Sequence, residues 1–160
     1  MEAASLEGTP LCVGLLDINK AYDSVSHKAA ITAWETTGMG YNKFFTQYIG
    51  GNSTQIRTPH GKSAPIQLTK GLQQGGMESP FLFDLVMIHA LRRANRCGKK
   101  EQHVQSCADD LALWAPDAGT LQIMITQLET DLRPCGLSIS HTAKKSKSET
   151  IWINCEPTQI

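Results

Sequence analysis

The sequence predicts a single α+β domain in which helices pack against an antiparallel sheet. Apolar runs of strand length occur along the chain between segments of helical periodicity, and turn-forming residues separate them. The chain has 160 residues, of which 41% are hydrophobic, so it can bury one core of ordinary size. It contains no internal repeat, low-complexity tract or linker.

The chain is expected to begin with a disordered lead-in over residues 1–10, followed by a buried strand. Residues 11–18 form a continuous apolar run with Asp17 near its end. The pattern predicts a helix over 26–38, with Ser26 as a candidate N-cap and a glycine at its end. The predicted inner face of this helix consists of Ala30, Ile31, Ala33 and Trp34.

Two further elements and a loop complete the first half. Residues 41–51 are predicted to form a short helix stopped by two glycines, and residues 53–69 a hairpin around a Pro-His-Gly-Lys turn. Residues 70–80 form a glycine-rich loop. At its end, Ser79 and Pro80 are typical of the N-cap and first position of a helix.

The second half begins with a helix over 81–96 that is apolar on nearly every face up to Arg92. Because a helix that is apolar all round is normally buried, we expect this one to lie inside the core. A second hairpin is predicted to pair residues 103–107 with residues 111–115. The sequence Ala-Asp-Asp then lies at its bend.

An amphipathic helix opening at Asp117 is predicted next, because apolar residues repeat there at helical spacing. These residues are Leu121, Met124, Ile125, Leu128 and Leu132. Strand character resumes over 136–140 and again over 150–154, on either side of a lysine-rich patch at 144–147.

Composition limits the classes of function. Lys plus Arg and Asp plus Glu number 15 each, so net charge provides no long-range attraction to nucleic acid or membrane, although a local nucleic-acid groove is not excluded. The five cysteines are scattered and never spaced as C-x-x-C, which favours a reducing intracellular setting, either nucleus or cytoplasm. The N-terminal apolar run is too short for a signal peptide or a membrane span.

Three aspartates near predicted strand ends form a candidate site. Asp17 ends the first strand, and Asp109 and Asp110 lie on the second hairpin turn, so these carboxylates converge if the two elements are neighbours in one sheet. Mg²⁺ prefers such oxygen ligands, and two ions about 3.5–4 Å apart can activate an attacking hydroxyl and stabilise a leaving oxygen. The residues alone leave an ordinary interpretation open, because aspartate also favours turns and strand ends.

Four segments, taken in order, resemble the catalytic motifs of a reverse transcriptase palm domain. They are "LLDINKAYDSVSH" (15–27), "GLQQGGMESPFLF" (71–83), "CADDLALWA" (107–115) and "CGLSISHTAKKS" (135–146). The sequence "SVSHKA" is closest in character to non-long-terminal-repeat (LINE-type) retrotransposons. The resemblance implies a polymerase palm-like α+β fold over 11–155, an antiparallel sheet packed on helices with fingers and thumb largely missing, and a tail over 156–160.

The resemblance also implies roles for particular residues. Asp17, Asp109 and Asp110 would be the catalytic ligands of two Mg²⁺ ions, for which Mn²⁺ could substitute. Tyr22 would exclude a ribose 2′-OH, and its alternative role is a core aromatic. Asp23 would lie beside the nucleotide pocket or, alternatively, cap the next helix.

The second and fourth motifs imply further substrate-binding residues. Gln74 and Gly75 would lie against the incoming nucleotide and template, where a glycine permits close approach of the backbone. Lys144 or Lys145 would be the fourth-motif lysine near the triphosphate. The alternative for this patch is a solvated charged edge.

The chain departs from the family pattern at several positions. Cys107 replaces the usual Phe or Tyr, so an apolar prop beneath the aspartates would be smaller. Gly76 and Glu78 stand where the family generally has Asp and Leu. Ser140 replaces a common Asn, and the longer gap that follows blurs the choice of fourth-motif lysine.

The activity implied by the resemblance is RNA-directed DNA polymerisation, in which a primer 3′-OH attacks the α-phosphate of a dNTP. The implied partners are an RNA template, a DNA primer, dNTPs and the remaining fingers and thumb segments of a parent polymerase, with no membrane partner. The chain is expected to be inactive or weak by itself. Two alternatives stay open: a non-catalytic, truncated transposon remnant, and a related group II intron maturase or retron-type polymerase.

Overall fold

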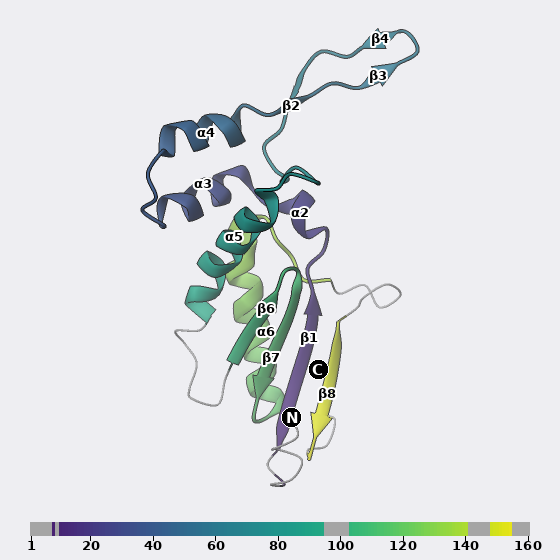
Figure 1. The fold of residues 1–160 in the computed structure, drawn as a ribbon. Coiled ribbons are helices and arrows are strands. Elements are labelled where there is room, and N and C mark those ends of the chain that lie inside the picture. The colour runs from purple at the N-terminus through teal and green to yellow at the C-terminus, as the bar shows by residue number, and fades with distance from the viewer. Residues whose placement is uncertain (1–7, 9, 95–102, 141–147, 155–160) are drawn as a thin grey trace.

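A four-stranded antiparallel sheet forms the centre of the computed structural model, which describes residues 8, 10–94, 103–140 and 148–154. The strand order is β6-β7-β1-β8, so the first strand of the chain lies inside the sheet (Figure 1). The bounds are β1 Leu11–Asp17, β6 His103–Cys107, β7 Asp110–Ala115 and β8 Glu149–Ile153. The predicted α+β arrangement, with helices on an antiparallel sheet, is confirmed.

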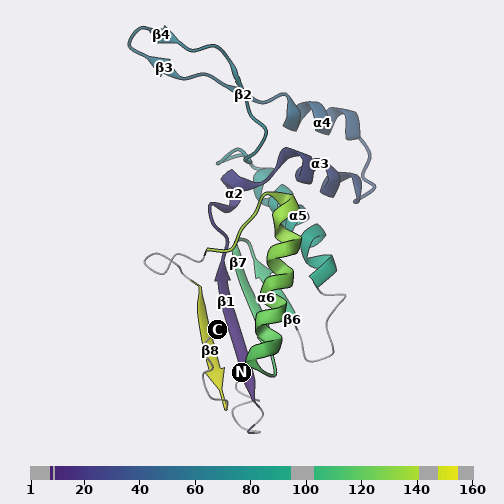
Figure 2. The ribbon, with the colours of Figure 1, turned by 180° about the vertical axis from the view of Figure 1, so that it is seen from behind.

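Two long helices, α5 (Ser79–Ala94) and α6 (Ala118–Leu132), lie on one side of the sheet (Figures 1 and 2). Helix α6 packs against β1 and β7, and α5 packs against α6. A Cβ added at Gly14 would lie 3.4 Å from Leu121 Cδ1, so this glycine allows α6 to lie close to β1. The residues of β7 that face this side are fully buried, namely Leu111, Leu113 and Ala115. The opposite side, which we call the open face, is covered by no helix of the described residues.

A second group of helices lies beyond the end of β1. It consists of α2 (Ala21–Ser24), α3 (His27–Glu35) and α4 (Asn42–Gly50). Trp34 of α3 stacks on Phe45 of α4 with ring centroids 4.4 Å apart, and α3 also packs against α5. Ser26 occupies the predicted N-cap position, although within the described residues its side chain makes no capping hydrogen bond.

Helix α4 leads into a long hairpin that projects away from the sheet (Figure 1). Its paired segments are β2 (Ser53–Thr54) with β5 (Ile66–Gln67), and β3 (Arg57–Thr58) with β4 (Gly61–Lys62). We call residues 53–67 the arm. The hairpin predicted over 53–69 is confirmed, and its turn lies at Pro59 and His60.

Asp117 is the N-cap of helix α6, which opens there as predicted, and its carboxylate accepts a hydrogen bond from the backbone N–H of Thr120 at 2.8 Å. This hydrogen bond lowers the pKa of Asp117, and a second one from the Thr120 hydroxyl adds to the effect. A 3-10 turn, η1 (Arg133–Cys135), follows α6 directly. Along the described residues, no helix is long and apolar enough to cross a membrane.

The prediction that the helix after the glycine-rich loop is buried on all faces was wrong. Phe81 is 45% exposed and Ile88 is 50% exposed, on the same face as the exposed Asp84. Its opposite face carries the fully buried Phe83 and Val86. An apolar composition therefore did not reveal which face of α5 meets the core.

Two predicted boundaries also differ from the structure. The helix begins at Ser79 itself, and the Ser79 hydroxyl donates to the backbone carbonyl of Gln73 at 2.6 Å, so it ties down the preceding loop. Residues 136–140 do not form a strand, because only an isolated bridge joins Ile139 to Ile18. The short segment is held by this bridge next to the end of β1.

Candidate functional site

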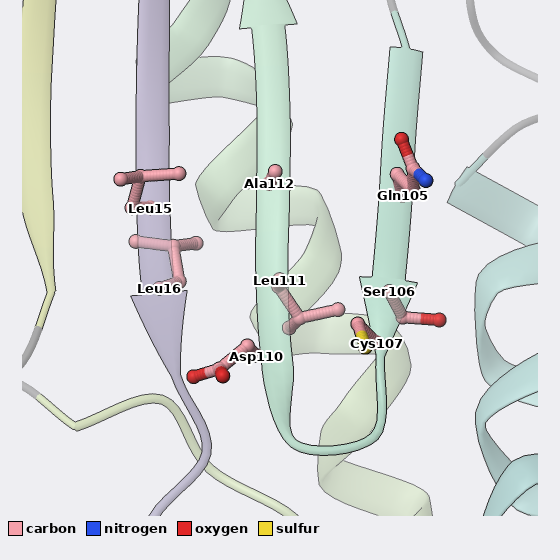
Figure 3. Close-up of a pocket in the computed structure, with 8 residues that line it drawn as sticks. All are labelled: Leu15, Leu16, Gln105, Ser106, Cys107, Asp110, Leu111 and Ala112. Carbon is pink, nitrogen blue, oxygen red and sulfur yellow. The ribbon is translucent and has the colours of Figure 1, made fainter.

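The end of β1 and the start of β7 bring two aspartates together. Asp17 and Asp110 are direct cross-strand partners in the antiparallel register. Directly opposed residues project from the same face of a sheet, with Cβ atoms roughly 4.5–5.5 Å apart. Gly14 and its partner Leu113 lie on the face that α6 covers, so the alternation of strand residues puts both aspartates on the open face. Figure 3 shows the Asp110 carboxylate extending from β7 toward β1.

A two-residue turn of Ala108 and Asp109 joins β6 to β7. Ala108 has φ 54°, in the left-handed region that a residue with a Cβ occupies at a cost of about 1–2 kcal/mol. The Asp109 carbonyl accepts a hydrogen bond from the backbone N–H of Ile18 at 3.2 Å, which ties the turn to the residue after Asp17. The prediction that Asp110 lies on the bend was wrong. Asp110 is the first residue of β7 and pairs with Cys107.

The backbone of Asp17 is also held from its other side. Its carbonyl accepts from the N–H of Ser140 at 2.9 Å, and its N–H donates to the Ser148 hydroxyl oxygen at 3.2 Å. The Ser148 hydroxyl in turn donates to the Ser140 carbonyl at 3.1 Å. The segments around Asp109, Ser140 and Ser148 therefore fix the position from which the Asp17 side chain projects.

A shallow hollow of about 390 Å³ lies beside Asp110 on the sheet (Figure 3). Cys107 is exposed and lines this hollow, so it is not a prop buried beneath the aspartates. The other lining residues are Leu15, Leu16, Gln105, Ser106, Leu111 and Ala112. The small thiol at 107 thus leaves open space next to the paired aspartates.

The predicted substrate-binding residues of the first two motifs also meet in space. The Gln74 side-chain amide donates to the Asp23 carboxylate at 2.9 Å, although the two residues are 51 positions apart. Asp23 lies within α2, and α3 has Ser26 at its N-cap, so the alternative of Asp23 capping that helix was wrong. Gly75 has φ 83°, a conformation that glycine adopts without strain.

Buried contacts hold this pair of segments together. The backbone N–H groups of Gly71 and Leu72 each donate at 2.8 Å, to the carbonyls of Val25 and Tyr22 respectively. The ring of Tyr22 is half-buried and stacks on Phe83 with centroids 4.9 Å apart. Both predicted roles of Tyr22 therefore remain compatible with its position, since one face of the ring packs on Phe83 while the side chain stays partly exposed.

His27 is a residue whose role the sequence did not indicate. Its side chain is 6% exposed, and its Nε2 lies 3.0 Å from the Gly71 carbonyl oxygen. This hydrogen bond anchors the glycine-rich loop to the start of α3. The histidine in "SVSH", which was noted only as part of a motif, is the signal that could have identified it.

Two departures from the family pattern are coupled in the structure. The Tyr48 hydroxyl of α4 donates to the carboxylate of Glu78. A Cβ at Gly76 would lie 2.9 Å from both Glu78 Oε1 and Ser79 Oγ, so the small residue leaves room for Glu78 to reach Tyr48. This hydrogen bond lowers the pKa of Glu78 and raises that of Tyr48, because it stabilises the carboxylate and the neutral phenol together.

The aspartates at the end of the sheet supply the kind of donor that a divalent metal prefers. Asp17 and Asp110 supply hard carboxylate oxygens from opposed positions, and Asp109 supplies another from the adjoining turn. Within the described ranges, however, no three His, Cys, Asp or Glu side chains are grouped closely enough to hold a metal ion. The carboxylate oxygens are thus of the type that a divalent cation binds. The structure opposes two of the three aspartates, Asp17 and Asp110.

Some predicted positions fall outside the described residues. These are Lys144 and Lys145 of the fourth motif, nearly all of the lead-in over 1–10, and the tail over 156–160.

An antiparallel sheet with helices on one side and two aspartates opposed at the end of its central strands is the arrangement of a polymerase palm. The family profile described as "Reverse transcriptase (RNA-dependent DNA polymerase)" matches residues 2–151. The chain belongs to this family, and the predicted resemblance to a reverse transcriptase domain is confirmed.

Curated relatives carry the same description of a retrotransposon protein. The chain is 30% identical over 146 residues to a "Retrovirus-related Pol polyprotein from type-1 retrotransposable element R2" of Popillia japonica, covering 85% of this chain and 20% of that protein. It is 28% identical over 151 residues to the type-2 element R2DM polyprotein of Drosophila melanogaster, covering 90% and 14%. These matches confirm the predicted relation to non-long-terminal-repeat elements. The chain spans a fifth or less of these relatives.

Solved telomerase structures share the fold. A telomerase from Candida tropicalis, solved with a fragment of telomeric RNA, has a TM-score of 0.74 at 13% identity, covering 90% of this chain and 26% of that one. A telomerase from Candida albicans has a TM-score of 0.72 at 11% identity, covering 99% and 29%. At these identities the likeness concerns the fold alone.

Proposed function

We propose that the chain is the catalytic palm portion of an RNA-directed DNA polymerase, which transfers a nucleotide from a dNTP to a primer 3′-OH on an RNA template. The opposed aspartates Asp17 and Asp110 carry this proposal, together with membership of the reverse transcriptase family. In such a reaction the protein needs no nucleophile of its own. Its task is to align the reactants and to concentrate charge where the phosphoryl group reacts.

Asp17, Asp109 and Asp110 would hold two Mg²⁺ ions, or Mn²⁺ in their place. When bound, such ions activate the primer hydroxyl and neutralise the charge on the reacting phosphate. The hydrogen bonds around Asp17 and the Asp109 turn keep the backbone of these residues in place. Binding would require the Asp109 side chain to join the opposed pair.

The remaining predicted residues would surround the nucleotide. Tyr22, packed on Phe83, would present its edge to the sugar and exclude a 2′-OH. The hydrogen-bonded Asp23 and Gln74 would lie beside the nucleotide, with Gly75 allowing the template backbone to approach. Lys144 or Lys145 would provide the positive charge for the triphosphate.

The proposed partners are an RNA template, a DNA primer, dNTPs and the fingers and thumb segments of a larger polymerase. The open face of the sheet carries Asp110 and the adjacent hollow, so the primer end would lie there. Template contacts would be mainly to the sugar–phosphate backbone, because copying requires indifference to sequence. The scattered cysteines, of which Cys107 and Cys135 are free thiols, support an intracellular setting.

Primer extension on poly(rA)/oligo(dT) with Mg²⁺ or Mn²⁺ tests this function. We expect at most weak extension by this chain, lost in Asp109→Ala and retained in Glu35→Gln, which removes an exposed carboxylate on α3. Extension at the same rate in Asp109→Ala would contradict the assignment of the carboxylates. The absence of any extension would favour the alternative of a non-catalytic remnant, which the departures at Cys107 and Gly76 also favour.

A further inference from the structure

The positive charge of this chain is concentrated in one segment. Although Lys plus Arg equals Asp plus Glu over the whole chain, no acidic residue occurs between Glu35 and Glu78. The same segment carries the basic residues Lys43, Arg57, Lys62 and Lys70, together with His60. An overall neutral protein therefore presents a local region of positive potential, which attracts a polyanion over short distances.

The arm displays this charge in an exposed position. It projects from the body of the molecule (Figure 1), and the side chains of Arg57, His60 and Lys62 are exposed. Arg57 and Lys62 are direct cross-strand partners. Like charges placed directly opposite each other destabilise a two-stranded ribbon, so this pair weakens the arm unless an anion lies between or beside the two groups.

The base of the arm opens into a polar groove of about 430 Å³. Lys70 lines this groove together with Asp23, whose carboxylate is bonded to Gln74. Asn52, Ser53, Thr54, Leu68, Gly71, Leu72 and Gln73 complete the lining. Basic groups thus continue from the tip of the arm to a groove that adjoins the proposed nucleotide-binding residues.

We propose that the arm binds the sugar–phosphate backbone of a single-stranded nucleic acid that runs along it toward this groove. Arg57 and Lys62 contact neighbouring phosphates, and Lys70 contacts the strand where it enters the groove. The contacts are to phosphates, so they are indifferent to base sequence. The choice of nucleic acid among polyanions rests on the proposed function, whereas the contact itself needs neither the catalytic aspartates nor a metal.

Fluorescence anisotropy of labelled oligo(U) RNA and oligo(dT) DNA, in EDTA and from 50 to 200 mM KCl, tests the proposal. Each phosphate contact on a single strand contributes about 0.7 to the slope of log affinity against log salt. Arg57→Gln/Lys62→Gln is therefore expected to lower that slope by about 1.4, and Lys62→Gln alone by about 0.7. The matched control is Lys28→Gln/Arg92→Gln, which removes one lysine and one arginine from exposed positions on α3 and α5.

Each outcome has a defined meaning. An equal loss of slope in the arm variant and the control variant, or no loss in either, would overturn the proposal. Equal effects on RNA and DNA identify phosphates as the contact, and a larger effect on RNA adds a contact to the 2′-OH while still supporting the arm. Because the assay contains EDTA, Asp109→Ala should bind like the unaltered chain. A chain without polymerase activity would therefore still show arm-dependent binding, which separates this inference from the proposed function.

Discussion

The aspartate end of the sheet and the arm, the two regions to which we assign functions, are built in opposite ways. The first lies where β1 pairs with β7 over six successive residue pairs, and β8 and the segment around Ser140 hold it from the other side. The arm has two ladders of two residue pairs each, and nearly all of its residues are exposed. The packed sheet thus fixes the positions of the two aspartates, whereas the basic side chains of the arm need only to be exposed to solvent.

The largest difference between the regions should appear when apolar side chains are shortened. Leu113 of β7 is 0% exposed, and Leu113→Ala should destabilise the chain by about 2–5 kcal/mol because it leaves a cavity in the core. Ile56 of the arm is 57% exposed, and Ile56→Ala should change stability by about 0.5 kcal/mol or less. Urea unfolding of both variants measures this difference. Similar losses of stability in the two variants would contradict the claim that the sheet and the arm are built differently.

Glycines in left-handed conformations provide a second comparison. Gly136 has φ 82°, and an added Cβ would lie 2.5 Å from the Ser24 backbone carbonyl oxygen, so Gly136→Ala must shift the backbone between η1 and α2. We expect a loss of about 2–4 kcal/mol. Gly61 in the arm has φ 128° but open space around it. Gly61→Ala should be absorbed by local opening of the arm and cost about 0.5 kcal/mol or less in global stability. Urea unfolding that gave equal losses for the two would show that the arm is coupled to the core.

The turn between β6 and β7, next to the paired aspartates, allows a test of backbone strain with a smaller expected effect. Ala108→Gly relieves the left-handed conformation of Ala108 and should stabilise the chain by about 0.5 kcal/mol, since the relief exceeds the extra freedom of the unfolded glycine. Ala112→Gly, four residues along the same hairpin in regular β7, should instead destabilise by about 1 kcal/mol. Thermal unfolding of both variants checks the sign. A destabilising Ala108→Gly would show that the turn is not strained.

The smallest expected effect concerns the contact between α4 and the glycine-rich loop. The hydrogen bond from Tyr48 lowers the pKa of Glu78 below its ordinary value of 4.5, so this bond stabilises the folded chain above about pH 4.5. That contribution is lost as the pH falls through the lowered pKa. Tyr48→Phe should therefore melt at a slightly lower temperature than the unaltered chain at pH 7, and this difference should shrink as the pH falls below 4.5. A difference in melting temperature that does not change with pH would point to packing of the ring instead.

The features that the sequence predicted are those with strong periodicity or a distinctive motif. The apolar run before Asp17 and the apolar residues after Asp110 predicted two strands, and the structure supplies the pairing between them that the predicted site required. The hydrogen bond between Asp23 and Gln74 joins two motifs that the family resemblance had already singled out. These features could be predicted because the local pattern and the fold require the same residues.

The features that were missed depend on tertiary contacts between residues with no periodic pattern. Tyr48 and Glu78 are 30 positions apart and both polar, so nothing in the sequence pairs them. Phe81 and Ile88 are apolar but exposed, because hydrophobicity alone does not say which face of α5 meets the core. Residues 136–140 have strand-like composition, but they form only one bridge where β1 ends.

The central claim is that Asp17 and Asp110 act together as ligands of a divalent cation, and Mn²⁺ binding followed by electron paramagnetic resonance tests it most directly. The unaltered chain should bind Mn²⁺, and Asp17→Asn and Asp110→Asn should each weaken binding by about tenfold or more. Asp84→Asn, which alters an exposed carboxylate on α5, should have no effect. Binding that is the same in all four proteins, or is absent from the unaltered chain, would contradict the claim.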